Sequence, residues 1–194
     1  MRNKDVIIRL AKLEDMESVQ KIYAPYVLNT AISFEFDVPS VTEFENRYAA
    51  IVQQYPFLVA ERAEEVVGYA YAGSFIERQA YDWTAELSIY VKQTLLKKGI
   101  GTKLYAELEK ILRLQNVQIC YACIAFSGLD DDACLDDTSI LFHQKKGFIK
   151  IGDFRQCGYK FERWYHMCYM EKRLVPQGTT PKPFIPFSKL YAAM

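Results

Sequence analysis

The sequence carries an apolar run, Glu86-Leu-Ser-Ile-Tyr-Val91, which leads within a few residues into a basic turn, Lys97-Lys-Gly-Ile-Gly-Thr102. A long amphipathic segment follows, so the pattern predicts a strand, a glycine-containing turn and a helix. The first turn of a helix leaves backbone N–H groups unpaired and carries the positive end of the helix dipole. Such a junction can hold a pyrophosphate, and we therefore expect a phosphorylated cofactor here.

The spacing of Gly99 and Gly101 excludes two common phosphate-binding motifs. A P-loop needs Lys-Ser or Lys-Thr directly after the second of two glycines five residues apart, whereas Thr102-Lys103 follows Gly101. A dinucleotide-binding fold needs a third glycine, near Leu104. The turn instead resembles the pattern Gln/Arg-x-x-Gly-x-Gly/Ala of coenzyme A-dependent N-acetyltransferases, the GNAT superfamily.

Motifs on both sides of the turn resemble the phosphinothricin/methionine-sulfone acetyltransferase branch of that superfamily. They are Gly68-Tyr-Ala-Tyr-Ala-Gly73, Arg78-Gln-Ala-Tyr-Asp-Trp-Thr-Ala-Glu86, Ser139-Ile-Leu-Phe-His143 with Gly147-Phe148, and Cys157-Gly-Tyr-Lys160 with Trp164. The resemblance runs from about Val6 to Leu174. The chain departs from the family pattern at Leu96, at Asp136 or Thr138, at Glu162 and at His166.

The resemblance implies an α/β fold of the GNAT type, with mixed α+β architecture. Its central sheet would be mixed, mostly antiparallel and of about six or seven strands, with helices on both faces. Residue patterns predict strands at 6–10, 57–60, 66–72, 84–91, 117–125, 148–154 and 159–172, and helices after residue 16 and at 40–55, 99–114 and 138–146. We expect one acetyltransferase domain, residues 1–174, and a proline-rich tail, residues 175–194, packed on the domain or on a dimer partner.

Composition limits the classes of partner. Acidic and basic residues balance at 24 each, so we expect no nucleic acid and no membrane surface as a partner. The first residues lack the apolar segment of a signal peptide, and five cysteines form no regular framework, so we expect a cytoplasmic protein. Cys120 and Cys123 lie three apart on a predicted strand and so face opposite ways, which indicates buried structural thiols and no metal site.

Two side chains are candidate catalysts. The resemblance implies that Glu86, at the start of the central strand, is the base that removes the proton of the acceptor amine; the alternative is a strand-end glutamate in a salt bridge. It also implies a role for His143, because this branch has a histidine where other members have a general-acid tyrosine. The alternative is a packed helix residue, and acid and base roles both stay open.

Further site residues follow from the resemblance. For acetyl-CoA they are the main chain of Ser88, Ile89, Tyr90 and Val91, the turn residues Lys97, Lys98, Gly99, Ile100, Gly101 and Thr102, and Thr138. For the acceptor they are Arg78 and Tyr81, which would face its acidic group, and Phe34, Phe36 and Trp83, which would wall its pocket. The alternatives are a surface arginine and core aromatics.

The resemblance implies direct transfer of acetyl from acetyl-CoA to the primary amine of a small, amino-acid-like acceptor in a ternary complex, by an enzyme that forms homodimers. One alternative acceptor is the amine of a polyamine, an aminoglycoside or a protein. An alternative of another class is a non-catalytic acyl-CoA-binding sensor. The presence of both Glu86 and His143 argues against the sensor.

Overall fold

The computed structural model describes residues 5–129 and 132–192. Residues 1–4 and 130–131 of the expected domain and residues 193–194 of the expected tail lie outside the described residues. Seven strands form one sheet in the order β1-β2-β3-β4-β5-β7-β6. Their bounds are β1 Ile7–Leu10, β2 Phe57–Arg62, β3 Glu65–Ser74, β4 Thr84–Val91, β5 Ile119–Phe126, β6 Ile149–Lys160 and β7 Arg163–Arg173. Neighbouring strands are antiparallel except β4 and β5, which are parallel. The expected mixed sheet is confirmed.

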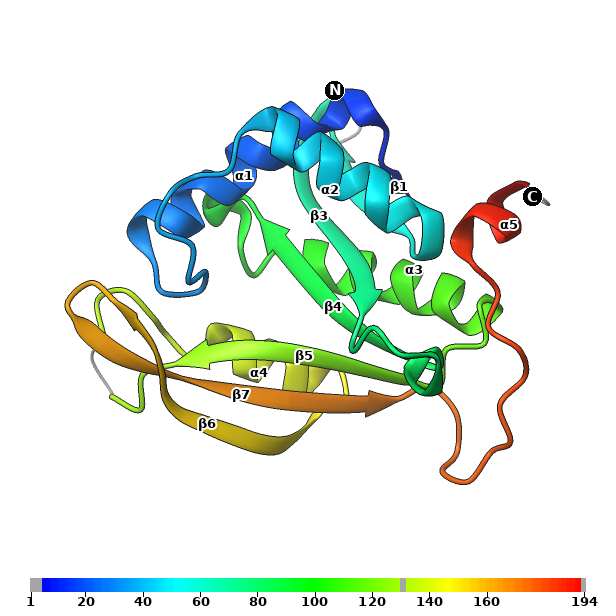
Figure 1. Cartoon of the computed structure of the whole chain (residues 1–194). Helices are drawn as coiled ribbons and strands as arrows, with labels where there is room; N and C mark the ends of the chain where they lie inside the picture. The colour runs from blue at the N-terminus through cyan, green and yellow to red at the C-terminus, as the bar shows by residue number, and fades with distance from the viewer. Residues whose placement is uncertain (1–4, 130–131, 193–194) are drawn as a thin grey trace.

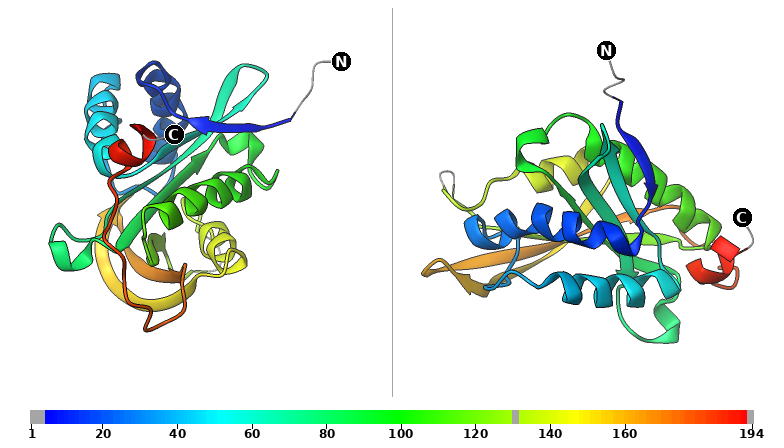
Figure 2. Two further views of the ribbon diagram at one scale, coloured as in Figure 1. Left: turned by 90° about the vertical axis from the view of Figure 1, so that its right-hand side faces the viewer. Right: turned by 90° about the horizontal axis from the view of Figure 1, so that it is seen from above.

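Helices cover both faces of the sheet (Figures 1 and 2). On one face lie α1 (Met16–Asn29) and α2 (Val41–Gln54), and on the other lie α3 (Ile100–Leu114) and α4 (Thr138–Lys145). Leu104 and Leu108 of α3 share a buried cluster with Leu87 of β4, whereas Val19 of α1 and Phe44 of α2 pack in a second buried cluster. Successive residues of β4 therefore face different helix layers.

The start of α2 shows how the local sequence sets a helix boundary. Ser40 Oγ accepts a hydrogen bond from the Glu43 N–H at 3.1 Å, which satisfies one unpaired donor of the first turn. The pattern Ser40-Val-Thr-Glu43 also predicts a return contact from the Glu43 carboxylate to the Ser40 N–H. That carboxylate instead pairs with Arg47 one turn later, so only half of the capping box forms.

The last hairpin differs from the predicted strand bounds. β6 continues through Lys160, with register shifts between Lys150 and Gly152 and between Phe154 and Gly158. The chain reverses at Phe161 and Glu162, whose φ angles are 50° and 59°. Two central residues with positive φ are typical of a type I′ hairpin turn, which usually contains Asn or Gly. Because neither residue is of that kind, the sequence gives no turn signal there.

The C-terminal tail lies back along the domain. Trp83 Nε1 donates to Lys182 O at 2.6 Å, and the side chain of Asn116 donates to Pro183 O at 2.8 Å. Ile185 N donates to Gln115 O at 3.1 Å. The tail ends in a short helix, α5 (Phe187–Ala192), which lies beside α2. In the described part of the chain no helix is long and apolar enough to cross a membrane.

Candidate active site

A split between β4 and β5 lies at the centre of the sheet. The two strands pair only at Thr84, Ala85 and Glu86 of β4 and then diverge (Figure 1), although β4 stays paired with β3 as far as Val91. An open cavity, with a volume of about 510 Å³ when the space at its mouth is counted, occupies the split and is lined by Ile32 and by residues of β4, β5, α3 and α4. Glu86 and His143 both lie on this cavity, so the structure brings the two candidate catalysts together.

The split leaves backbone donors of β4 without a strand partner. Lys92 N donates to Val67 O of β3 at 2.9 Å. Because hydrogen-bonded and non-bonded pairs alternate in antiparallel strands, every second residue back from Lys92 points its N–H at β3. The N–H group of Leu87, directly after the last paired residue Glu86, still faces Tyr121 of β5, whereas the N–H group of Ile89 points into the split. Ile89 belongs to the main-chain segment 88–91 that was expected to contact acetyl-CoA.

Glu86 is a half-buried carboxylate without a cationic neighbour. It lies on the sheet face opposite α3, and burial raises its pKa above the usual value. Its one side-chain partner among the described residues is the Tyr169 hydroxyl, which donates to Oε2 at 3.5 Å. The alternative of a salt-bridged strand-end glutamate does not hold in the described part of the chain.

His143 is buried, with 3% of its surface exposed, and both ring nitrogens have partners. Nδ1 lies 2.7 Å from Ser139 O, and Nε2 lies 2.8 Å from the Tyr105 hydroxyl. A carbonyl only accepts, so Nδ1 carries the proton and Nε2 accepts from the Tyr105 O–H. Burial lowers the pKa of His143 to about 4, which keeps the ring neutral at pH 7.

The start of α3 has the geometry expected of an anion-binding turn. Gly99 caps the helix with φ 81°, a left-handed conformation that glycine adopts without steric cost. The first helical hydrogen bond of α3 is donated by Lys103 N to Gly99 O, four residues earlier, at 3.2 Å. The N–H groups of residues 100–102 therefore have no partner within the helix. The side chains of Lys97 and Lys98 are exposed beside them.

Gly101 is a point of close contact between three elements. A Cβ added there would lie 3.2 Å from the Phe142 ring of α4 and 3.3 Å from Ile89 Cδ1 of β4. Both distances are tighter than ordinary van der Waals contact. Only glycine therefore lets the first turn of α3 lie so close to α4 and to the split.

The remaining predicted cofactor residues divide into two groups. Ser88, Ile89 and Tyr90 line the cavity. Val91 and Thr138 do not: Val91 O accepts from the Tyr26 hydroxyl at 2.5 Å, and the Thr138 hydroxyl donates to Asp136 at 2.8 Å.

The predicted acceptor residues lie outside the cavity at the split. Phe34 packs on Gly158, where an added Cβ would lie 2.1 Å from its ring, and Phe36 is 68% exposed. Arg78 is exposed and Tyr81 is half-buried, on the loop that precedes β4. Trp83, described above, contacts the tail and not a pocket.

Lys160 ties the loop that carries Phe34 to the last hairpin. Its buried ammonium donates to the carbonyl oxygens of Val27, Thr30 and Ser33 at 2.7, 3.1 and 2.7 Å. These carbonyls belong to the end of α1 and to the loop that carries Phe34. Three carbonyl partners compensate the burial of a charged group, and burial lowers the pKa of Lys160.

Several residues at the site carry no signal in the sequence. Tyr105 fits the apolar face of α3 in the sequence, yet its hydroxyl is hydrogen-bonded to His143 Nε2. Tyr169 lies 83 positions from Glu86 in the chain. Cys123 was expected to be a buried structural thiol, but it is half-buried and lines the cavity. Cys120, on the opposite face of β5, is buried in the core as expected.

A parallel strand pair that splits beside a carboxylate, with unpaired N–H groups at the start of the next helix, is an arrangement that suits an acyl-CoA-dependent transferase. The chain belongs to the GNAT acetyltransferases: the family model described as "Acetyltransferase (GNAT) domain" matches residues 8–169. It is an acetyl-CoA-dependent acetyltransferase. The unpaired N–H groups at the split and at the start of α3 fit that cofactor.

Relatives support the same assignment. The chain is 30% identical to a phosphinothricin N-acetyltransferase of Streptomyces viridochromogenes, over 96% of this chain and 97% of the relative. It is 32% identical to an L-methionine sulfoximine/L-methionine sulfone acetyltransferase of Pseudomonas aeruginosa, over 90% and 98%. A crystal structure of a phosphinothricin acetyltransferase from Sinorhizobium meliloti in complex with acetyl-CoA superposes with a TM-score of 0.84 at 30% identity, covering 95% of this chain and 97% of that one.

Gly101→Val is expected to abolish the rise in melting temperature that acetyl-CoA causes. A ligand at 100 times its dissociation constant stabilises a protein by about 2.7 kcal/mol, and the valine side chain would push into Phe142 and Ile89. The measurement is thermal unfolding with and without acetyl-CoA. Gly152→Ala is the control, because an added Cβ there meets nothing within 4 Å. An undiminished shift in Gly101→Val would remove this turn from the cofactor site.

Proposed function

We propose that this acetyltransferase acetylates the primary amine of a small, amino-acid-like acceptor by direct transfer in a ternary complex. The observation that carries the proposal is the position of Glu86: a half-buried carboxylate without an ion pair in the described chain, on the same cavity as His143. The two relatives described above, which are acetyltransferases of phosphinothricin and of methionine sulfoximine and sulfone, support an amino-acid-like acceptor.

Each chemical task has a group of this chain at the split. Acetyl-CoA supplies an activated acetyl group and a thiolate leaving group. Glu86, whose raised pKa makes it a better proton acceptor than an exposed carboxylate, takes a proton from the acceptor ammonium. The N–H group of Ile89 donates to the oxygen on which negative charge develops.

We assign the protonation of the leaving thiolate to the hydrogen-bonded pair of Tyr105 and His143. The ring is neutral at rest, since burial lowers its pKa to about 4. His143 therefore does not store a proton before the reaction. A negative charge developing nearby favours its protonated form. As the amine nitrogen bonds to the acetyl carbon, the pair takes the second proton from that nitrogen and delivers it to the thiolate when the C–S bond breaks.

We assign the acceptor to the sheet face that carries Glu86. Phe75 stacks on Tyr121 with ring centroids 4.2 Å apart and meets Tyr169 edge-on at 5.7 Å, which gives an aromatic surface next to Glu86. Tyr81 packs against Phe75 at 6.1 Å, so the loop that carries Arg78 adjoins this surface. We therefore propose that Arg78 binds the carboxylate of the acceptor.

We also propose a homodimer formed along β6. This strand is an edge of the sheet, and edge strands expose unpaired backbone groups. Ile149, Ile151 and Phe154 on it are 63%, 50% and 54% exposed. We expect Ile151→Lys to be a monomer where the native chain is a dimer, as measured by sedimentation velocity. A monomeric native chain would contradict the proposal.

The function is tested by release of free thiol from acetyl-CoA over a panel of amines. The panel contains L-methionine sulfone, phosphinothricin, L-methionine, spermidine, an aminoglycoside and a lysine peptide. We expect the highest kcat/KM among the amino-acid acceptors. A preference for spermidine, the aminoglycoside or the peptide would contradict the proposed acceptor class.

A further inference from the structure

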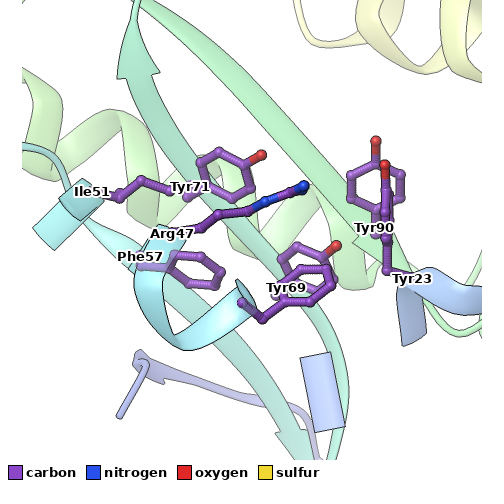
Figure 3. Close-up of a pocket in the computed structure, with 8 residues that line it drawn as sticks. Tyr23, Arg47, Ile51, Phe57, Tyr69, Tyr71 and Tyr90 are labelled. Atoms are coloured by element: carbon purple, nitrogen blue, oxygen red, sulfur yellow. The ribbon is translucent and has the colours of Figure 1, made fainter. Parts of the chain in front are cut away.

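A second cavity lies beneath α2, on the sheet face that carries Glu86 (Figure 3). It is open, with a volume of about 320 Å³ when the space at its mouth is counted. Tyr23, Arg47, Tyr71 and Tyr90 contribute its polar groups. Tyr90 also lines the cavity at the split, so the two cavities adjoin at this residue.

Arg47 presents part of its guanidinium to this cavity. Figure 3 shows the group directed toward Tyr90, and its central carbon lies 5.5 Å from the centre of the Phe44 ring. Its hydrogen bonds to Glu35, at 2.9 Å, and to Glu43 both use Nη2. Among the described residues no hydrogen bond uses Nη1 or Nε of Arg47. Glu35 and Glu43 thus hold the arginine in place and leave two of its donor nitrogens open.

Tyr71 and Tyr90 add further donors, whereas the Tyr23 hydroxyl is already hydrogen-bonded to Ser33 Oγ at 2.6 Å. Burial raises the pKa of Tyr23 to about 12 and raises those of Tyr71 and Tyr90 above their usual value, so all three hydroxyls stay protonated. A guanidinium and neutral phenols together form a donor-rich surface. Such a surface suits oxygen atoms of a phosphinate, a carboxylate or a sulfone.

The spacing along β4 relates this cavity to Glu86. Glu86, Ser88 and Tyr90 are alternate residues on one face, and each step of two residues advances about 7 Å along a strand. Tyr71 of β3 pairs directly with Ser88, one step from Glu86. An acceptor whose amine meets Glu86 would therefore reach this cavity with its distal group and not with its α-carboxylate, which lies next to the amine.

We infer that Arg47, with the hydroxyls of Tyr71 and Tyr90, forms a subsite for the distal oxygen-bearing group of the acceptor. The inference rests on the proposed function and names a specificity-determining residue for it. Under this inference two arginines bind different parts of the acceptor: Arg47 binds the sulfonyl or phosphinyl oxygens, and Arg78 binds the carboxylate.

The test compares two arginine variants on two acceptors. L-methionine sulfone and L-methionine share a carboxylate and a chain length, and differ in the sulfonyl oxygens. Arg47→Gln is expected to lower kcat/KM for the sulfone by about 10- to 100-fold more than for methionine, as for loss of a hydrogen bond from a charged donor. The matched variant Arg78→Gln should lower both values by the same factor. Tyr71→Phe should follow Arg47→Gln with a smaller loss.

A purely structural Arg47 would behave differently. Loss of its contacts to Glu35 and Glu43 would lower the melting temperature and reduce kcat/KM for both acceptors equally, and that outcome overturns the subsite. Arg47→Lys keeps a positive charge near Glu35 but lacks the planar fork, so it should keep the melting temperature while losing sulfone preference.

Failure of the proposed function is recognised separately. If the native chain acetylates neither acceptor, calorimetric titration with L-methionine sulfone in the presence of coenzyme A decides the subsite. Binding that weakens about 10-fold or more in Arg47→Gln supports it. Absence of binding to the native chain, or equal binding to both proteins, overturns it.

Discussion

Glu86→Gln is expected to lower turnover by about 10²-fold or more near pH 7 while acetyl-CoA still raises the melting temperature. The substitution keeps the shape of the side chain and its place at the split, but an amide cannot accept the ammonium proton. The measurement is kcat at saturating acceptor, with cofactor binding followed by thermal unfolding. Wild-type turnover in a folded Glu86→Gln protein would rule out the base role.

The pH dependence separates a base from a binding group. A free amine needs no base, so the loss caused by Glu86→Gln should shrink as the pH rises toward the pKa of the acceptor amine. Because burial raises the pKa of Glu86, native activity should also decline on acidification at a higher pH than an exposed carboxylate would give. Glu107→Gln, on α3 where Glu107 pairs with Lys110, is the control and should change neither property.

His143→Phe is expected to reduce turnover by about 10²-fold and also to cost stability. The phenyl ring fills the space of the imidazole, but it leaves the Tyr105 hydroxyl, which is 0% exposed, without its partner. An unsatisfied buried donor costs about 1–3 kcal/mol. Single-variant data therefore cannot separate a catalytic from a structural role.

The double variant His143→Phe with Tyr105→Phe makes that separation. Replacing both members of a buried hydrogen bond by apolar groups is nearly neutral for stability, so the double variant should regain most of the lost melting temperature. If the pair moves a proton, turnover stays low. Recovery of turnover together with stability would show that the pair is only structural.

His143 also links stability to pH. Its pKa falls from 6.5 in the unfolded chain to about 4 in the folded one, so the unfolded state binds more protons between these values. The contribution of the neutral, buried His143 to the free energy of unfolding is therefore fully present above pH 6.5. This contribution falls by about 3 kcal/mol as the pH is lowered toward 4. In His143→Phe this part of the acid sensitivity should disappear, as measured by denaturant unfolding at several pH values.

The sequence predicts the central elements well and the surroundings of the site less well. β4 and α3 were predictable because alternation and helical spacing are strong there, and Gly99 and Gly101 mark the turn between them. The turn at Phe161 and Glu162 was not predictable, since neither residue is typical of a positive φ. Arg47 lies in the second cavity and Tyr169 lies beside Glu86 because segments distant in the sequence pack together. A local sequence pattern cannot predict such contacts.

Lys160 has a consequence for the order in which the protein is completed. Its ammonium binds carbonyls that lie 127 to 133 positions earlier in the chain. Contacts of such separation form late in folding, because the chain loses loop-closure entropy before they contribute any stabilisation. The loop that carries Phe34 therefore reaches its final position only after β6 has been synthesised and folded. On a ribosome, this loop, which adds Ile32 to the lining of the cavity at the split, would be finished after the rest of the sheet.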